Sequence, residues 1–292
     1  MTHLIGQAAR SVGRVLLSHG GTHTATEILD DGTELTVDFT VEGDRGSLAI
    51  HGPSHPGNLN APRAVARAAL LYVLRSLVDE PLPLLNEGSL LPVSLETTAG
   101  GLFNPQHPSA VAGGNVETSQ RLVDALLRAL GAQAGSQGTM NNLTVGTRGG
   151  VWYETIGGGS GAGPGFHGAD AVQVHMTNTR ASDVEDLEAR FPVRILRWGR
   201  HADSGGQGEW RGGQGTEKVW EFGDHAEVAI LAERRAAGAP GVNGGEPGLQ
   251  GKDEVDFGKG WEPAPSRFSA CAGTRLRIRT PGGGGFGLFS TD

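Results

Sequence analysis

The sequence predicts an α+β fold, a strand-rich mixed fold with two long helices and glycine-rich loops. Two segments repeat apolar residues at helical spacing, and most other apolar residues alternate with polar ones. Glycine accounts for 49 of 292 residues, about 17% of the chain against roughly 7% in an average protein. The glycines follow no three-residue period, which excludes collagen and favours turns and closely packed backbone segments.

The N-terminal segment predicts a short helix followed by antiparallel strands. Residues 1–18 place apolar side chains on one side of a helix. From residue 22 to residue 50 the period changes to two. Segments 24–29 and 34–41, joined by the turn 30–32, predict a hairpin, and 47–50 predicts a further strand.

The two long helices are predicted from their apolar stripes. The first has Pro62 in its opening turn and ends before Pro81, because proline lacks the N–H that a helix interior needs. The second begins near Asn115, a natural N-cap residue, and ends at Gly131.

The rest of the chain is predicted to be mainly strands. A third, shorter helix opens at Ser182, with Glu185 completing a capping box. The predicted strands are 142–147, 150–156, 171–179, 193–198, 218–222, 226–231 and 275–280. No linker is evident, so we expect residues 1–292 to form a single globular unit, with a weak boundary near 104–114.

Composition excludes several classes of protein. The formal net charge is −8 and there is no run of Lys or Arg, so we expect no nucleic-acid partner. No stretch reaches the ~18 apolar residues of a membrane span, and the start lacks a signal-peptide core, which predicts a cytoplasmic protein with no membrane partner. The single cysteine, Cys271, excludes an internal disulfide, and we expect it to be a small buried residue.

Histidine is the first candidate for chemistry. His19 and His23, and likewise His51 and His55, are four residues apart, but glycine or proline in each gap argues against a helical metal site. We expect polar loops there and no bound metal. His175 lies in a predicted apolar strand, where a hydrogen-bonded core residue is the commoner role, yet it is the best histidine candidate for a site.

Two polar blocks are further candidates. Asn115 and Glu117 open the second helix, where free N–H groups favour anions, although a plain solvated cap is the alternative. Gln137, Asn141 and Asn142 stand close together in sequence, and an amide can orient a ligand because it carries both a donor and an acceptor. A turn is the alternative for these three amides.

A glycine-rich loop follows the strand at 150–156. It contains three consecutive glycines, Gly157, Gly158 and Gly159. Such a loop lets the backbone approach a phosphate or another backbone closely. No lysine follows as in a P-loop, and no helix follows as in a dinucleotide-binding turn.

Several of these blocks occur in the order found in a known family. NPQHPSAVAGGNVETSQRLVDALL (104–127), SQGTMNNLTVG (136–146), YETIGGGSGAGP (153–164), DSGGQGEWRGGQG (203–215) and PGGGGFG (281–287) resemble the hydantoinase B/oxoprolinase family. The resemblance covers roughly residues 24–287 and extends to the C-terminal half of family members. Their N-terminal metal-binding motif is not matched, because HGGTH (19–23) lacks its flanking residues. The resemblance therefore implies that the family's divalent metal is not bound by this chain.

The resemblance implies a subunit or fragment of an ATP-dependent cyclic amide hydrolase that opens a hydantoin or 5-oxoproline ring. The implied partners are a hydantoinase A-type, actin-like ATPase subunit that holds the ATP, an N-terminal hydantoinase B lobe and a small cyclic amide. We expect Glu117 to be a charge partner or base and His175 a proton relay. Asn115, Gln137, Asn141 and Asn142 would orient the substrate, and Gly157, Gly158 and Gly159 would form a close-approach loop.

An alternative is a non-catalytic remnant or interaction module that lacks the metal-binding lobe. In either case we expect no activity from the chain alone. The substrate, and the choice between hydrolase and carboxylase chemistry, stay open at this point.

Overall fold

The computed structural model describes residues 2–80 and 86–289. Contacts divide the chain into two compact units, residues 1–132 and residues 133–292. The division lies C-terminal to segment 104–114, the weak boundary that the sequence suggested. Each unit is described by itself below.

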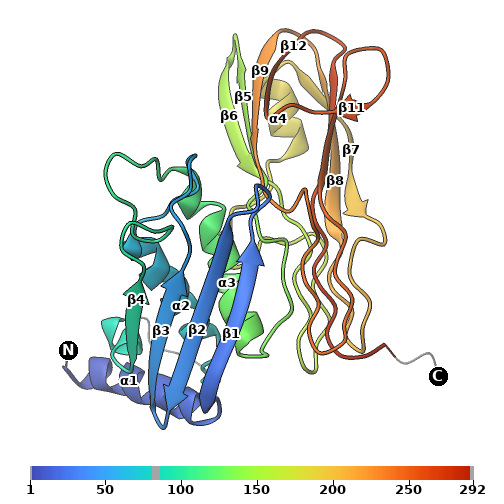
Figure 1. Ribbon diagram of the computed structural model, residues 1–292. Coiled ribbons are helices and arrows are strands. Elements are labelled where there is room, and N and C mark those ends of the chain that lie inside the picture. The colour runs from blue at the N-terminus through green and yellow to red at the C-terminus, as the bar shows by residue number, and fades with distance from the viewer. Residues whose placement is uncertain (1, 81–85, 290–292) are drawn as a thin grey trace. The chain divides into compact units, whose positions relative to one another are not determined.

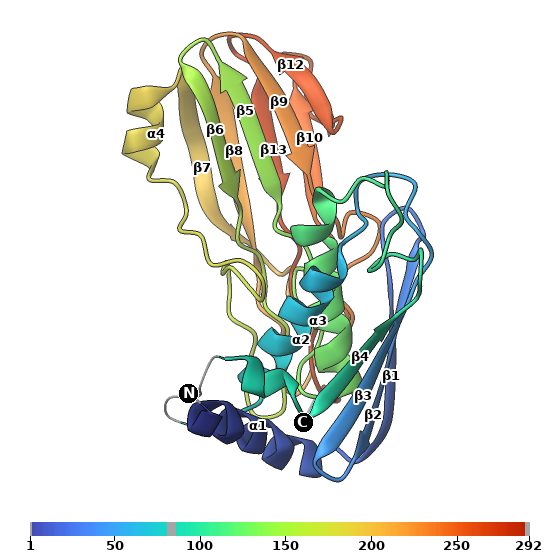
Figure 2. The same ribbon diagram turned by 90° about the vertical axis from the view of Figure 1, so that its left-hand side faces the viewer.

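The first unit contains a mixed sheet with α-helices on one side (Figures 1 and 2). The sheet order is β1-β2-β3-β4, in which β4 runs parallel to β3 and the other pairs are antiparallel. Its elements are α1 (Thr2–Leu17), β1 (Gly21–Ile28), β2 (Glu34–Glu42), β3 (Arg45–His51), α2 (Arg63–Ser76), η1 (Glu87–Leu90), β4 (Val93–Thr97), η2 (Gly113–Asn115) and α3 (Thr118–Ala129). The N-terminal helix and the hairpin predicted from residues 1–50 are confirmed. Segment β4 was not predicted.

Alternation along β2 shows why this sheet forms. Leu35, Val37 and Phe39 are fully buried, whereas the residues between them stay partly exposed. One face of the strand therefore packs into the core and the other faces outward. This confirms the period-two pattern read from the sequence.

The start of α3 differs from the prediction. Asn115 is not the N-cap, because it lies in the short 3-10 turn η2, and Glu117 takes the N-cap position. Close packing explains the shift: a Cβ on Gly114 would lie 2.0 Å from the carbonyl oxygen of Asn60. Residues 113–115 therefore pack against the backbone at Asn60 as a 3-10 turn, and the α-helix begins after this contact. Gly131 ends the helix at φ +63°, as predicted.

The first long helix also follows its prediction closely. Pro62 takes the N-cap position of α2, one residue before the helix begins at Arg63. The helix ends at Ser76, and the predicted stop at Pro81 lies outside the described residues. None of the described helices is both long and apolar enough to cross a lipid bilayer.

The second unit is built from two antiparallel sheets with a shared core (Figure 2). The orders are β12-β9-β5-β6 and β11-β10-β13-β8-β7. The elements are β5 (Asn142–Thr147), β6 (Gly150–Thr155), α4 (Val184–Arg190), β7 (Val193–His201), β8 (Gly215–Phe222), β9 (Ala226–Leu231), β10 (Lys252–Asp256), β11 (Glu262–Pro263), β12 (Arg267–Ala270) and β13 (Arg275–Arg279). Trp152, Trp220 and Leu276 lie in the core between the sheets. The α+β, strand-rich class is confirmed.

Three predictions in this unit are wrong. Residues 171–179 form no strand, and His175 lies in a turn with φ +53°. The capping box at Ser182 is displaced by one residue, since Asp183 is the N-cap and accepts from the backbone N–H of Asp186 at 3.0 Å. Cys271 is exposed, because it sits in the turn between β12 and β13.

The glycine-rich segments pack side by side as extended chains. Segment 281–287 is hydrogen-bonded to four others: Gly159 N–H donates to Pro281, Gly206 to Gly283, Gly284 to Gly135, and Gly285 to Glu246, at 2.8–2.9 Å. The bonds go singly to several neighbours rather than as a ladder to one, which resembles packed polyproline-type chains more than a β-sheet. We call these segments (134–137, 157–163, 204–213, 238–250 and 281–287) the glycine bundle. Glycine is required inside it because chains approach within backbone contact distance.

Candidate functional site

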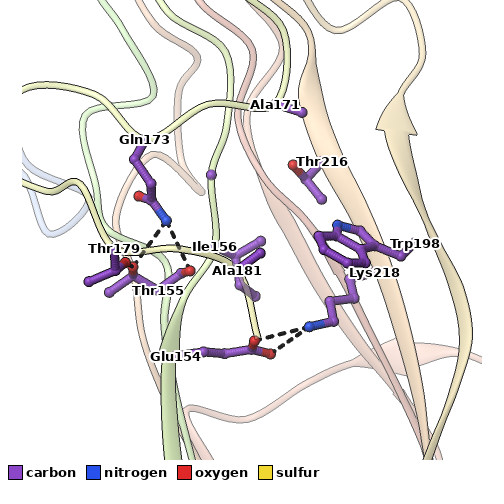
Figure 3. A pocket seen from close by; sticks show the side chains of 11 residues that line it. Glu154, Thr155, Ile156, Ala171, Gln173, Thr179, Ala181, Trp198, Thr216 and Lys218 are labelled. Atoms are coloured by element: carbon purple, nitrogen blue, oxygen red, sulfur yellow. Dashed lines mark hydrogen bonds and ion pairs between the residues drawn. The ribbon is translucent and has the colours of Figure 1, made fainter. Parts of the chain in front are cut away.

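The second unit contains a cavity of about 210 Å³ that we call the ion-pair pocket (Figure 3). Strands β6, β7 and β8 and the loop that follows β6 form its walls. Its lining residues are Glu154, Thr155, Ile156, Gly157, Ala171, Gln173, Thr179, Ala181, Trp198, Thr216 and Lys218. Of the residues predicted from sequence, Gly157 borders this cavity.

A buried ion pair forms one wall of the pocket. Lys218 Nζ lies 3.0 Å from both carboxylate oxygens of Glu154, and the two side chains are 2% and 3% exposed. Glu154 comes from β6 and Lys218 from β8, so the pair joins the two sheets. The ammonium also lies 5.2 Å from the Trp198 ring centre and 5.0 Å from that of Trp220. Aromatic faces stabilise such a desolvated cation.

Hydrogen bonds fix the opposite wall. Gln173 Nε2 donates to both the carbonyl and the hydroxyl oxygen of Thr155, each at 3.0 Å. The Thr155 and Thr179 hydroxyls are hydrogen-bonded to each other. The Thr216 hydroxyl is directed towards the space between these walls (Figure 3).

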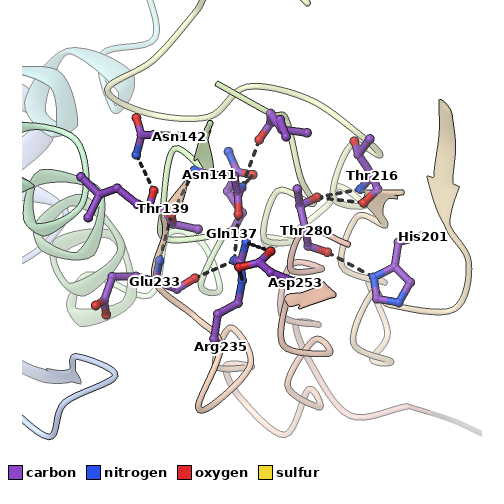
Figure 4. A network of polar contacts seen from close by, with 12 residues as sticks. Gln137, Thr139, Asn141, Asn142, His201, Thr216, Glu233, Arg235, Asp253 and Thr280 are labelled. Carbon is purple, nitrogen blue, oxygen red and sulfur yellow. Dashed lines mark hydrogen bonds and ion pairs between the residues drawn. The ribbon is translucent and has the colours of Figure 1, made fainter. Parts of the chain in front are cut away.

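A buried polar network, whose side chains are drawn in Figure 4, is hydrogen-bonded to the segment 156–157. Asn141 Nδ2 donates to Gln137 Oε1 and to the Ile156 carbonyl, each at 3.0 Å. Arg235 Nη1 donates to Asn141 Oδ1 at 2.8 Å, and its other nitrogens hold Asp253 at 2.9 and 3.0 Å. Gln137 and Asn141 are therefore brought together, and they orient protein backbone at the pocket wall.

Threonine 280 completes the support of this wall. Thr280 Oγ1 donates to the Gly157 carbonyl at 2.9 Å and accepts from the Thr216 N–H at 2.7 Å. The carbonyls of two consecutive residues, Ile156 and Gly157, are thus held from behind. The pocket wall is pre-organised by side chains that do not line the pocket.

The other glycines of the predicted loop pack closely against protein atoms. A Cβ on Gly158 would lie 2.2 Å from Gln137 Oε1, and one on Gly159 would lie 2.0 Å from the Gly213 carbonyl oxygen. Of the two close approaches considered for this loop, the structure shows the approach to protein.

The remaining predicted residues of the second unit lie elsewhere. Asn142 is on β5 and donates to the Leu231 carbonyl at 2.7 Å, which ties β5 to β9. His175 is half-buried in its turn.

Asn115 and Glu117 belong to the first unit. Glu117 is fully buried at the start of α3, and so are Thr118, Ser119 and Gln120. Ser119 Oγ donates to the Asn115 carbonyl at 2.6 Å. Residues 117–120 are therefore a buried polar cluster rather than a solvated cap, whereas Asn115 is exposed.

A second buried ion pair ties α3 to β1 in the first unit. Arg121 Nη1 lies 3.0 Å from Glu27 Oε2, and Arg128 Nη2 lies 2.6 Å from Glu27 Oε1. Glu27 and Arg121 side chains are each 1% exposed. This cluster positions the helix that carries Glu117.

The paired histidines contact other groups of the first unit, and His23 and His51 lie in strands β1 and β3 instead of the expected polar loops. His23 lies in β1, where its Nε2 is 2.8 Å from the His19 carbonyl oxygen, and His55 Nε2 is 2.7 Å from Asp31 Oδ2. Among residues 2–80 and 86–289, no three His, Cys, Asp or Glu side chains gather as metal ligands. The described residues therefore do not fit the divalent metal that the family resemblance implied for other members.

Sequence reasoning missed the ion-pair pocket, although a signal existed. Glu154 and Lys218 stand at inward positions of their strands, beside Trp152 and Trp220. A charge on the core face of one strand requires an opposite charge on another. No sequence pattern indicated that Trp198 and Gln173 would line the pocket.

Comparison with known proteins decides the relationship. The family described as Hydantoinase B/oxoprolinase matches residues 1–288. The chain belongs to the hydantoinase B/oxoprolinase family. Its relative 5-oxoprolinase 1 of Arabidopsis thaliana is 44% identical over 268 residues, which cover 89% of this chain and 21% of that protein.

Solved structures share the fold of this hydantoinase B family chain. The ATP-dependent caprolactamase of Pseudomonas jessenii is 26% identical with a TM-score of 0.84, over 98% of this chain and 55% of the other. An acetone carboxylase is 15% identical with a TM-score of 0.80, over 96% and 47%, and shows the fold alone. The chain thus spans about a fifth of the 5-oxoprolinase and about half of the two solved chains.

Proposed function

We propose that this chain takes part in the ATP-dependent hydrolysis of a cyclic amide. The 44% identity to 5-oxoprolinase 1 across 89% of the chain carries the proposal. The similarity to a caprolactamase supports it, because both names denote enzymes that act on lactams. We place the assembly in the cytoplasm, where ATP is available.

The chemistry explains why an assembly is needed. Resonance makes an amide a poor electrophile, and transfer of a phosphoryl group from ATP to the amide oxygen removes that resonance. Water then adds to the amide carbon, the ring C–N bond breaks as the nitrogen takes up a proton, and hydrolysis of the resulting acyl phosphate releases phosphate and the carboxylate. In the proposal, a hydantoinase A-type ATPase subunit holds the ATP, and an N-terminal hydantoinase B lobe completes the site. This chain then contributes groups that orient water and the activated amide.

The residues proposed for these roles are those predicted from sequence. Glu117 acts as charge partner or base, Asn115 orients the substrate, and His175 relays a proton. Burial of Glu117 among Thr118, Ser119 and Gln120 supports a role beyond capping, because its side chain makes no cap hydrogen bond.

The residues of the second unit act mainly by position. Gln137 and Asn141 are positioning residues that hold segment 156–157, and Asn142 fixes β5 against β9. Gly157, Gly158 and Gly159 allow the close backbone approaches that this arrangement requires.

Reconstitution tests the proposal. The chain is purified alone and with a hydantoinase A-type subunit and an N-terminal hydantoinase B lobe, and phosphate release and ring opening are measured with 5-oxoproline, hydantoin and caprolactam. We expect ATP-dependent ring opening of at least one lactam by the assembly and none by the chain alone. An assembly that forms but opens no ring would support the interaction-module alternative. Phosphate release that requires acetone and no lactam would favour carboxylation instead.

A further inference from the structure

The ion-pair pocket has no assigned role, and its chemistry identifies a class of ligand. A buried ion pair contributes little net stability, because desolvation of two charges offsets their attraction. Here the pair borders a cavity of about 210 Å³ instead of being enclosed by apolar side chains. Such a site offers hydrogen-bonding groups to a small ligand, and the site itself carries no net charge.

The pair presents one donor and one acceptor side by side. An ammonium has three protons, and two hydrogen bonds of Lys218 go to Glu154, which leaves one proton for a guest. Each carboxylate oxygen of Glu154 retains acceptor capacity, 3.0 Å from the same nitrogen. A guest that matches this edge must carry an acceptor and a donor on neighbouring atoms.

The other walls define the rest of the guest. Trp198 is 47% exposed, and its ring supplies a flat face beside the pair (Figure 3). Ile156, Ala171 and Ala181 supply apolar contact, and Thr216 offers a hydroxyl. A small planar neutral molecule with apolar carbons fits this combination, whereas an ion would disturb the neutral pair.

We propose that the ion-pair pocket binds a small neutral amide whose C=O accepts from Lys218 and whose N–H donates to Glu154, with its plane against Trp198. A cis amide edge, as in a lactam, a urea or a primary carboxamide, presents these two groups on adjacent atoms. The preference for lactams within this class rests on the proposed function. The site is a binding site, and no bond is made or broken in it.

Titration with 2-pyrrolidinone tests the proposal without ATP or partner subunits, so its result is independent of turnover. Binding to the whole chain is followed by calorimetry and by ligand NMR. We expect saturable 1:1 binding with Kd on the order of millimolar, as suits a ligand of so few atoms. N-methylpyrrolidinone keeps the ring and carbonyl but lacks the N–H, and cyclopentanone replaces the amide with a ketone. Each should bind at least tenfold more weakly.

Variants locate the binding. Trp198→Ala should weaken 2-pyrrolidinone at least tenfold, whereas Leu196→Ala should leave Kd unchanged, since Leu196 is a neighbouring exposed residue of β7 that does not line the pocket. Gln173→Met alters the opposite wall and keeps the test valid if Trp198→Ala does not fold. It should weaken binding severalfold. Equal affinity for the N-methylated ring, or equal affinity of Trp198→Ala and the unmodified chain, would overturn the proposal.

Discussion

At the level of single residues, the buried ion pairs are the positions where a substitution should change stability most. Each unit contains a carboxylate that is almost fully buried against a cation, Glu27 with Arg121 and Glu154 with Lys218. Removal of one partner leaves a desolvated charge, whereas removal of both leaves only a packing change. The two kinds of substitution therefore separate the cost of an unpaired charge from the value of the pair.

Single and double substitutions at the ion-pair pocket should differ strongly. Glu154→Gln and Lys218→Met should each lower the free energy of unfolding by about 3–5 kcal/mol, because each leaves a buried charge unpaired. The double variant should lose far less than the sum of the two. Urea denaturation of the three variants measures this. Additive losses would show that the two side chains do not act as a pair.

Substitution of Glu117 tests the proposed base. In the reconstituted assembly, Glu117→Gln should lower lactam-dependent turnover by roughly 10²–10⁴-fold, the usual contribution of a general base. Glu185→Gln, at an exposed position of α4, is the matched control and should leave turnover unchanged. Circular dichroism checks that both variants fold. Normal turnover by Glu117→Gln would remove this residue from the site.

At the level of elements, the sequence predicted the helices and strands whose residue pattern is complete within a short segment. The hairpin β1–β2 and strands β5 and β9 matched closely because their alternation and turns are encoded within a few residues. The segment around His175 was predicted as a strand because its residues alternate, yet it contains a turn in which His175 takes a positive φ of +53°, a backbone conformation outside the β region. Strand β10 is short and highly charged, and β12 has only four residues, so neither carries an apolar alternation. Their pairing with β13 and β9 makes them strands.

The glycine bundle is the element whose stability depends most on residue size. A Cβ on Gly283 would lie 1.9 Å from the Ser160 carbonyl oxygen, which is backbone and cannot rotate away. Gly283→Ala should therefore destabilise the fold by more than the ~1–3 kcal/mol of ordinary overpacking. Gly199→Ala on β7 is the control, since a Cβ there meets nothing within 4 Å. Thermal unfolding compares the two. A similar melting temperature for both variants would mean that the chains of the glycine bundle move apart at little cost, which would contradict the prediction.

At the level of the whole molecule, the candidate sites combine residues that are distant in sequence. Glu154 and Lys218 are 64 positions apart, and Asn141 and Arg235 are 94 apart. Motif order indicated the family, and clustered amides indicated Gln137 and Asn141. The pocket itself depends on which strands become neighbours, which no local pattern specifies.

The acid sensitivity of the whole chain follows from carboxylates held by arginines. Burial on its own raises the pKa of Asp170, but the Gln214 N–H at 2.8 Å and the guanidinium groups of Arg200 and Arg211 outweigh it and hold the pKa below its ordinary value. The pKa of Glu254 is also below its ordinary value. Burial raises this pKa, but the larger combined effect of Lys252, Arg277 and Arg279 lowers it. In the unfolded chain these groups titrate near ~3.9 and ~4.3, so the unfolded state binds more protons as the pH falls through this range.

The stability that Asp170 and Glu254 contribute should therefore be constant from about pH 7 to pH 5 and should fall progressively below about pH 4. Asp170→Asn tests the assignment within one protein. At pH 7 this substitution should lower the free energy of unfolding by about 1 kcal/mol, a modest value because the arginine partners of Asp170 are partly exposed to solvent. At about pH 3 the cost should shrink, since the unmodified Asp170 is then losing its charge as well. Urea unfolding at both pH values measures the difference. An equal cost at both would mean that the Asp170 charge does not contribute to the acid dependence of folding.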